Sequence, residues 1–241
     1  MMTAGGRWRR RSVVIVGIFF LLTMHLLALS MVGRFAGITE PDKATLVVIT
    51  GCALLAWSLM ASQALESVTR AFYARSDLDL ILSSPTAARK VFAVRIATIA
   101  FSIAASAMLL ASPFVNVLAA SGGARWLRAY GVIAALGALA AALALALMIA
   151  LFRTIGPKRT RLIAQVVAAM IGAAFVIGMQ IAAIVSTDTM SRFSLLGSDT
   201  AVALAPDTDS ILWWPARAIL GDGAALVAIL GTALVVLGVV I

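Results

Sequence analysis

Residues 131–152 read GVIAALGALAAALALALMIALF, and this run contains no charged side chain. A helix rises about 1.5 Å per residue, so a run of this length can cross a hydrocarbon core of roughly 30 Å. Five more apolar runs occur in the chain, at residues 12–32, 45–65, 91–120, 162–185 and 224–241. Because lipid offers the backbone no hydrogen-bonding partner, each run is predicted to be a helix. We therefore predict an all-α, polytopic membrane helix bundle of six transmembrane helices, forming a single transmembrane domain over residues 1–241.

The composition agrees with lipid as the main solvent of this chain. Hydrophobic residues make up 63% and charged residues 12%, whereas soluble domains average about 45–50% and 25%. The formal net charge of +9 is a property shared with nucleic-acid-binding proteins. The distribution of the cations among the loops explains that charge more simply, so no nucleic-acid partner is expected.

The cations are concentrated in alternate connections. Thirteen of the 19 Lys and Arg residues are Arg7, Arg9, Arg10, Arg11, Arg70, Arg75, Arg89, Lys90, Arg95, Arg153, Lys158, Arg159 and Arg161. The other six fall in the connections of opposite parity, together with seven of the ten acids. Positive residues resist translocation, so the side with 13 cations is predicted to be cytoplasmic. With six spans, both termini then lie on that side.

The two ends of the chain carry further predictions. The apolar run after Arg11 is longer than the 7–15 residues of a signal peptide, so we interpret it as an uncleaved first helix. The last run reaches Ile241 without a polar tail. A helix that stops there leaves its final carbonyls at the hydrocarbon edge, which is costly. We therefore expect the natural polypeptide to continue beyond the sixth span, and the sequence to be truncated there.

Several residues within and between the spans predict local features. Pro113 is expected to kink or stop the third helix. Trp126 is expected in the interfacial aromatic belt. The segment 211–220, ILWWPARAIL, is expected to form a short helix that lies in the outer interface or dips into it and returns, a partly re-entrant segment before the sixth span. His25 and Asn116 are expected to form hydrogen bonds between helices.

The connection 66–90 is the most informative loop. Glu66 and Arg70 stand four residues apart, so the second helix is expected to extend into the cytosol. Ser76 and Asp79 have the spacing of a capping box, which predicts a new short helix from about Asp77. Its apolar residues Leu78, Ile81 and Leu82 share one face. Such a helix can dock into a groove on a partner or rest on lipid headgroups, and the residues alone leave both interpretations open.

A resemblance to a known family begins in this loop. Residues 75–85, RSDLDLILSSP, and 88–95, ARKVFAVR, resemble permease subunits of bacterial ATP-binding-cassette transporters of the type-2 exporter class. Residues 151–161, LFRTIGPKRTR, are similar to an inner loop of the same permeases, more weakly. The number of spans and the segment before the sixth helix also resemble this class. The resemblance implies a location in the bacterial inner (cytoplasmic) membrane.

The resemblance also implies a mechanism and a set of partners. The connection between the second and third spans would be a cytoplasmic coupling helix that docks on an ABC ATPase. The docking residues it implies are Arg75, Asp77, Leu78, Asp79, Leu80, Ile81, Leu82 and Arg89. A second permease subunit or copy would complete a dimer, and ATP would bind the partner, because the chain has no GxxxxGK[ST] motif. Transport would proceed by alternating access.

Other function classes stay open or have little support. The sequence has no metal-ligand spacing and no serine or cysteine placed near a base, so no catalytic, cofactor or metal site is expected and the chain is not expected to be an enzyme. Cys52, the single cysteine, is interpreted as a packing residue. The alternatives are an ATPase-independent carrier or channel whose inner loop lies at the lipid interface, or an inactive truncated permease that serves as a membrane scaffold.

Overall fold

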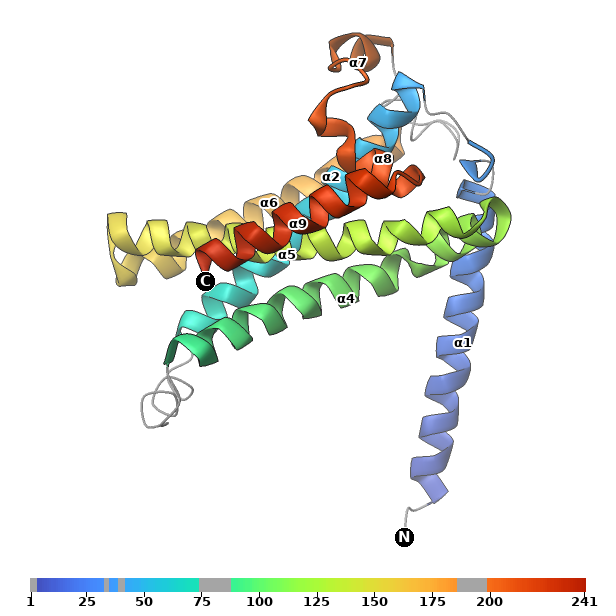
Figure 1. Cartoon of the computed structure of the whole chain (residues 1–241). Helices are drawn as coiled ribbons and strands as arrows, with labels where there is room; N and C mark the ends of the chain where they lie inside the picture. Colours follow the sequence, from blue (N-terminus) through green and yellow to red (C-terminus); the bar gives the residue numbers. More distant parts are fainter. Residues whose placement is uncertain (1–3, 33–34, 39–41, 74–87, 186–198) are drawn as a thin grey trace.

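The computed structural model describes residues 4–32, 35–38, 42–73, 88–185 and 199–241, and these residues form a helix bundle (Figure 1). The long helices are α1 (Ala4–Val32), α2 (Lys43–Tyr73), α4 (Ala88–Gly122), α5 (Arg128–Ile155), α6 (Pro157–Val185) and α9 (Gly223–Val240). No strand occurs within these ranges. The predicted all-helical fold is therefore confirmed for this part of the chain.

In the described part of the chain, six helices are long and apolar enough to cross a membrane. The candidate spans are Val14–Val32, Lys43–Tyr73, Lys90–Gly122, Ala124–Ile155, Pro157–Gln180 and Gly223–Val240. Each overlaps one of the six runs predicted from the sequence. By length and composition, the chain has the helices of a multi-pass membrane protein.

Helix α5 lies at the centre of the bundle, in contact with α2, α4, α6, α8 and α9. In the most apolar 18-residue stretch of this span, 50% of the residues are buried, compared with 6% in the corresponding stretch of α1. Many of its buried residues are alanines, and Gly137 comes so close to α4 that a β-carbon there would lie 2.9 Å from the Ala104 Cβ. Small residues allow helix backbones to approach closely where lipid gives no hydrophobic drive for association. The alanine- and glycine-rich sequence of residues 131–152 by itself predicts such packing against other helices, and the structure confirms it.

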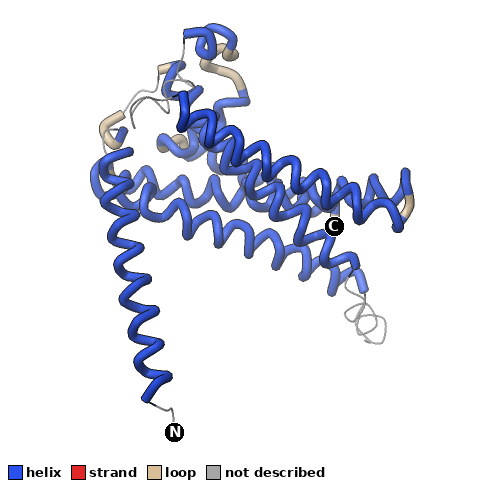
Figure 2. Tube along the Cα trace, turned by 180° about the vertical axis from the view of Figure 1, so that it is seen from behind, coloured by secondary structure: helices blue, strands red, loops and turns tan. Residues whose placement is uncertain are grey.

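Helix α1 diverges from the rest of the bundle (Figure 2). Its main contact is with α4. Large apolar side chains along it are exposed, including Phe19 at 71% and Leu26 at 69%. In a bilayer this surface faces lipid or another membrane helix, since exposure of such side chains to water is unfavourable.

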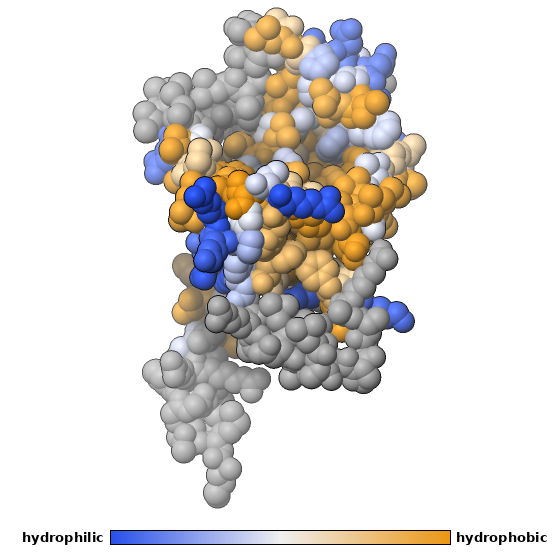
Figure 3. Space-filling model, turned by 90° about the vertical axis from the view of Figure 1, so that its left-hand side faces the viewer, coloured by the Kyte–Doolittle hydropathy of each residue, from blue (hydrophilic) through white to orange (hydrophobic). Residues whose placement is uncertain are grey.

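Apolar side chains cover much of the outer surface of the bundle as well, as the orange areas of Figure 3 show. Examples are Phe101 and Leu109 on α4 and Val239 on α9. Each of these residues has more than two thirds of its surface exposed. In a soluble protein an apolar surface of this extent would be a binding or aggregation site. On helices of this length it is the surface expected to contact lipid.

Helix α4 continues through Pro113 to Gly122, so the helix does not stop at this proline. The alternative, a kink, stays a prediction. Proline has no N–H to donate to the carbonyl four residues earlier, which here belongs to Leu109. The Ser112 hydroxyl donates to that same carbonyl oxygen at 2.8 Å. A neighbouring side chain therefore satisfies the freed acceptor, as membrane helices require.

Three groups meet at the C-terminal end of α4 in what we call the outer clasp: Gly122, the 3-10 helix η2 (Ala124–Leu127) and the carbonyl oxygen of Ala36. Arg125 Nη2 and Trp126 Nε1 donate to that oxygen at 2.9 and 3.4 Å. Trp126 is only 2% exposed, so protein encloses its ring, and its predicted place in the interfacial belt stays a prediction. Its indole N–H binds a backbone acceptor inside the protein instead of a headgroup.

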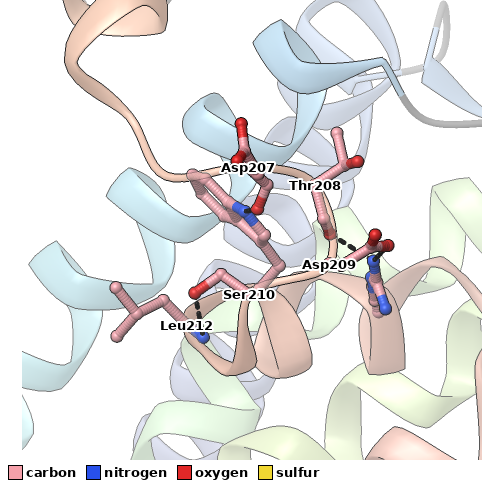
Figure 4. Close-up of polar contacts among 7 residues, drawn as sticks. Asp207, Thr208, Asp209, Ser210 and Leu212 are labelled. Carbon is pink, nitrogen blue, oxygen red and sulfur yellow. Dashed lines mark hydrogen bonds and ion pairs between the residues drawn. The ribbon is translucent and has the colours of Figure 1, made fainter.

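The segment before α9 contains α7 (Asp199–Leu204), η4 (Ile211–Trp213) and α8 (Trp214–Leu220), and Figure 4 shows its polar contacts. Trp213 Nε1 donates to the Asp207 carbonyl oxygen at 2.8 Å. Arg217 donates to the Thr208 carbonyl oxygen and lies 3.5 Å from the Asp209 carboxylate. The predicted short helix at 211–220 is confirmed. Its partial entry into the membrane stays a prediction.

Asp42 caps the start of α2, because its Oδ1 accepts the Thr45 backbone N–H at 2.8 Å. Hydrogen bonds from Thr45, first from its side chain and then from its backbone, hold the pKa of the Asp42 carboxyl below its ordinary value. The stabilisation from the ionised cap is therefore complete above the unfolded-state pKa and is lost as pH falls through the lower folded-state value.

We expect Asp42→Ala to lower the free energy of unfolding by about 1 kcal/mol at neutral pH, since a lost N-cap costs that much. The loss should begin to shrink as pH falls below about 4, the ordinary pKa of an aspartate, and shrink further as pH falls through the lower folded-state pKa. Thermal unfolding of both proteins in detergent between pH 3 and pH 7 measures the difference. Asp42→Asn, which retains a capping oxygen without a charge, should lose less stability than Asp42→Ala. Equal losses in the two variants would contradict the cap.

Candidate functional site

Most of the predicted docking residues lie outside the described ranges. These are Arg75, Asp77, Leu78, Asp79, Leu80, Ile81 and Leu82, all within 74–87. Arg89 belongs to the first turn of α4, where only its backbone is described. The coupling helix and its capping box therefore stay predictions.

The structure does describe the two helix ends from which that loop departs. The end of α2 and the start of α4 come together at the lower left of Figure 1. There Phe72 packs against Phe92 and Phe152 with ring centroids 5.4 Å apart in each pair, and Tyr73 stacks on Phe152 at 5.9 Å. We call these four side chains the inner aromatic cluster. It joins α2, α4 and α5 at the base of the loop.

A further contact ties the same place to α6. The Tyr73 hydroxyl donates to the Pro157 carbonyl oxygen at 2.5 Å, and the Arg161 guanidinium lies 5.8 Å from the centre of the Tyr73 ring. The sequence analysis missed this cluster. Four aromatic residues within a few positions of three span ends were the available signal, although their pairing depends on how the helices pack.

Glu66 and Arg70 lie on the part of α2 that leads to this end. Their ion pair has an N–O distance of 3.6 Å, with 60% and 71% of the two side chains exposed. Helix α2 continues beyond them to Tyr73. The predicted extension of the second helix past Glu66 is thus confirmed, and exposed pairs of this kind contribute little to stability.

A hollow of about 420 Å³ lies between α2 and α4, and we call it the polar groove. Residues at i, i+3, i+4 and i+7 of α2 form one wall, and hydroxyl residues four apart on α4 form the other. The lining residues are Gln63, Glu66, Ser67 and Arg70 from α2, with Thr98, Ile99, Ser102, Ile103 and Ser106 from α4. A surface that only contacts lipid needs no polar side chains. Their presence on two adjacent candidate spans therefore marks this groove as a candidate functional site.

A larger hollow of about 650 Å³, the outer cavity, lies nearer the other end of α2. Its walls are almost entirely apolar and come mainly from α2, α4 and α5. Half-buried Cys52 lies on the α2 wall, with Phe114 and Ile133 among the residues opposite. The same face of α2 therefore changes from apolar at the outer cavity to polar at the groove.

The polar residues predicted inside the spans have different partners. Asn116 accepts a hydrogen bond from the Tyr130 hydroxyl at 2.9 Å, which confirms the expected bond between helices α4 and α5. His25 lies with its Nδ1 2.8 Å from the Leu21 carbonyl oxygen of its own helix, so the expected bond to a neighbouring helix was wrong. Helix α1 diverges from the bundle, and His25 pairs with the carbonyl one turn earlier in its own helix.

Comparison with known proteins adds no family to these observations: no family model, curated protein or solved structure matches the chain.

Proposed function

We propose that this chain is the transmembrane permease subunit of an ATP-driven, ABC-type exporter. It would act in the bacterial inner membrane with a cytoplasmic ATPase subunit and a second permease subunit or copy, both termini facing the cytoplasm. One observation carries the proposal: residues 75–95, which resemble the coupling segment of such permeases, connect the second and third of six candidate spans.

The packing around that connection supports a mechanical role. Helices α2 and α4 contain 31 and 35 residues, or about 46 and 52 Å, so both are longer than the roughly 30 Å hydrocarbon core. The inner aromatic cluster ties their ends to α5, and Tyr73 ties them to α6. A displacement applied between the two ends would therefore move several spans together, as alternating access requires.

The polar groove favours a second candidate, an ATPase-independent carrier or channel. Such a protein also needs polar groups along its spans, and it needs no docking loop. The two candidates differ in whether solute crosses the membrane without nucleotide.

Purification of the tagged chain from its own cells tests the proposal. We expect a soluble polypeptide with a Walker A sequence to co-purify in mild detergent, and ATPase activity to appear in the purified complex. Mass spectrometry identifies the partner and phosphate release measures the activity. Solute flux in proteoliposomes of the chain alone, without nucleotide and without a bound ATPase, would contradict the proposal and favour the carrier.

A further inference from the structure

The α4 wall of the polar groove offers hydrogen-bond acceptors, because its hydroxyl hydrogens are already donated within the helix. Thr98, Ser102 and Ser106 donate their hydroxyl hydrogens to carbonyl oxygens of their own helix, those of Val94, Thr98 and Ile103, at 2.8, 2.8 and 2.9 Å. A hydroxyl has one hydrogen and two lone pairs, so each oxygen remains available as an acceptor. The α4 wall therefore offers a ladder of acceptors to whatever occupies the groove.

The opposite wall places a carboxylate beside that ladder. Glu66 is an acceptor when ionised, and Gln63, one turn away toward the middle of α2, adds an amide oxygen. Among the described residues that line the groove, the cation is Arg70, which is 71% exposed and forms a 3.6 Å ion pair with Glu66. A surface pair of this kind is worth little, so a ligand cation can replace Arg70 as the partner of Glu66.

The floor of the groove is apolar. Ile99 and Ile103 lie between the hydroxyl residues along α4 and line the same hollow. Its volume of about 420 Å³ lies within the range of roughly 300–1,000 Å³ that small-molecule sites occupy. A ligand that fits this surface has a charged hydrogen-bond donor at one end and a short hydrocarbon chain.

We propose that the polar groove between α2 and α4 binds the primary ammonium group of an alkylammonium compound. Glu66 and adjacent hydroxyls of the Thr98, Ser102 and Ser106 ladder receive its N–H donors, and Ile99 and Ile103 contact its carbon chain. The site requires neither the ATPase nor the docking loop, so an experiment can contradict this proposal without contradicting the proposed function, and the reverse.

Three probes of equal chain length test this charge preference: n-butylammonium, 1-butanol and butyrate. The protein is reconstituted in nanodiscs of phosphatidylcholine, whose headgroup has no N–H donor, and binding is measured by isothermal titration. We expect butylammonium to bind and the neutral and anionic probes to bind at least tenfold more weakly. Equal binding of butylammonium and butanol would overturn the proposal, because it would indicate simple partition into apolar surface.

Two variants locate the site, each with a matched control. Glu66→Gln should weaken butylammonium binding by about tenfold to a hundredfold, the usual value of a hydrogen bond to a charged group. Asp209→Asn, at a carboxylate 100% exposed outside the groove, should leave the binding unchanged. Ser102→Ala should weaken it by a few-fold to tenfold, whereas Thr232→Val should not. Thr232 likewise donates to its own helix, to Ala228 at 2.8 Å, and does not line the groove.

A second arm distinguishes a free amine from a lipid headgroup as the source of the ammonium group. Phosphatidylethanolamine carries a primary ammonium, so its addition to the nanodisc should compete with butylammonium if the groove takes headgroups. If the ligand is a free amine, the affinity should not change. Either result supports the ammonium site. Unchanged affinity in both Glu66→Gln and Ser102→Ala, with the thermal unfolding midpoint of each variant close to that of the parent, would overturn it.

Discussion

Replacement of both Leu78 and Ile81 by aspartate is expected to abolish the proposed association of this chain with an ATPase and, with it, the proposed nucleotide-dependent transport. The two residues share the apolar face of the predicted coupling helix with Leu82. A helix that docks in a groove places such residues in the buried centre of the interface, where a few side chains carry most of the binding energy. A buried, unpaired carboxylate there costs several kcal/mol, which corresponds to a loss of at least a thousandfold in affinity.

Pull-down of the ATPase by tagged permease, followed by ATPase measurement on the eluate, gives the result directly. The matched control is Leu204→Asp with Ile211→Asp, one leucine and one isoleucine that are 84% and 68% exposed near the opposite end of the bundle. The control double variant should still pull down the ATPase. Membrane insertion and the elution volume should be the same in both double variants. Retention of the ATPase by Leu78→Asp/Ile81→Asp would contradict the docking assignment.

Gly122→Ala is expected to destabilise the protein by about 3 kcal/mol, at the upper end of the range for overpacking. A β-carbon at Gly122 would lie 2.3 Å from the Ala36 oxygen and 2.6 Å from Trp126 Nε1. The clash involves backbone, so rotation of one flexible side chain cannot relieve it. Displacement of the Ala36 carbonyl would also weaken the hydrogen bonds from Arg125 and Trp126, and the outer clasp would open.

Gly231→Ala provides the control, because a β-carbon at Gly231 meets nothing within 4 Å. Alanine is favoured over glycine inside a helix by roughly 0.5–1 kcal/mol, so this variant should be as stable as the parent or slightly more so. Thermal unfolding in nanodiscs, followed by circular dichroism and by tryptophan fluorescence, compares the two. Similar unfolding midpoints for Gly122→Ala and Gly231→Ala would show that the clasp contributes little.

The hydrogen-bond partners around Pro113 and Trp126 could not be predicted from the sequence. Pro113 and Trp126 were assigned by rules that treat one residue in an average environment, a helix breaker and an interfacial aromatic. In the folded chain the Ser112 hydroxyl takes over the carbonyl that the proline leaves free, and the Ala36 carbonyl takes the indole N–H. Partners of this kind come from local geometry or from segments about 90 residues away, and a hydropathy pattern contains neither.

In the polar groove, the sequence shows the two helix faces, but only the tertiary structure shows that they meet. The spacing of Gln63, Glu66, Ser67 and Arg70 on α2 is visible in the sequence as one helical face, and so is the four-residue spacing of Thr98, Ser102 and Ser106. Only the packing of α2 against α4 makes these faces two walls of one hollow.

The sequence by itself determined the helical fold, the six candidate spans and the central, alanine-rich helix. Hydropathy is a sum over about 20 neighbouring residues, and lipid allows such a segment little other than a helix. The tertiary structure decided which faces meet: the inner aromatic cluster, the outer clasp and the groove between α2 and α4. These depend on how closely helices approach and at what angle, which small residues such as Gly122 and Gly137 set through contacts between distant parts of the chain.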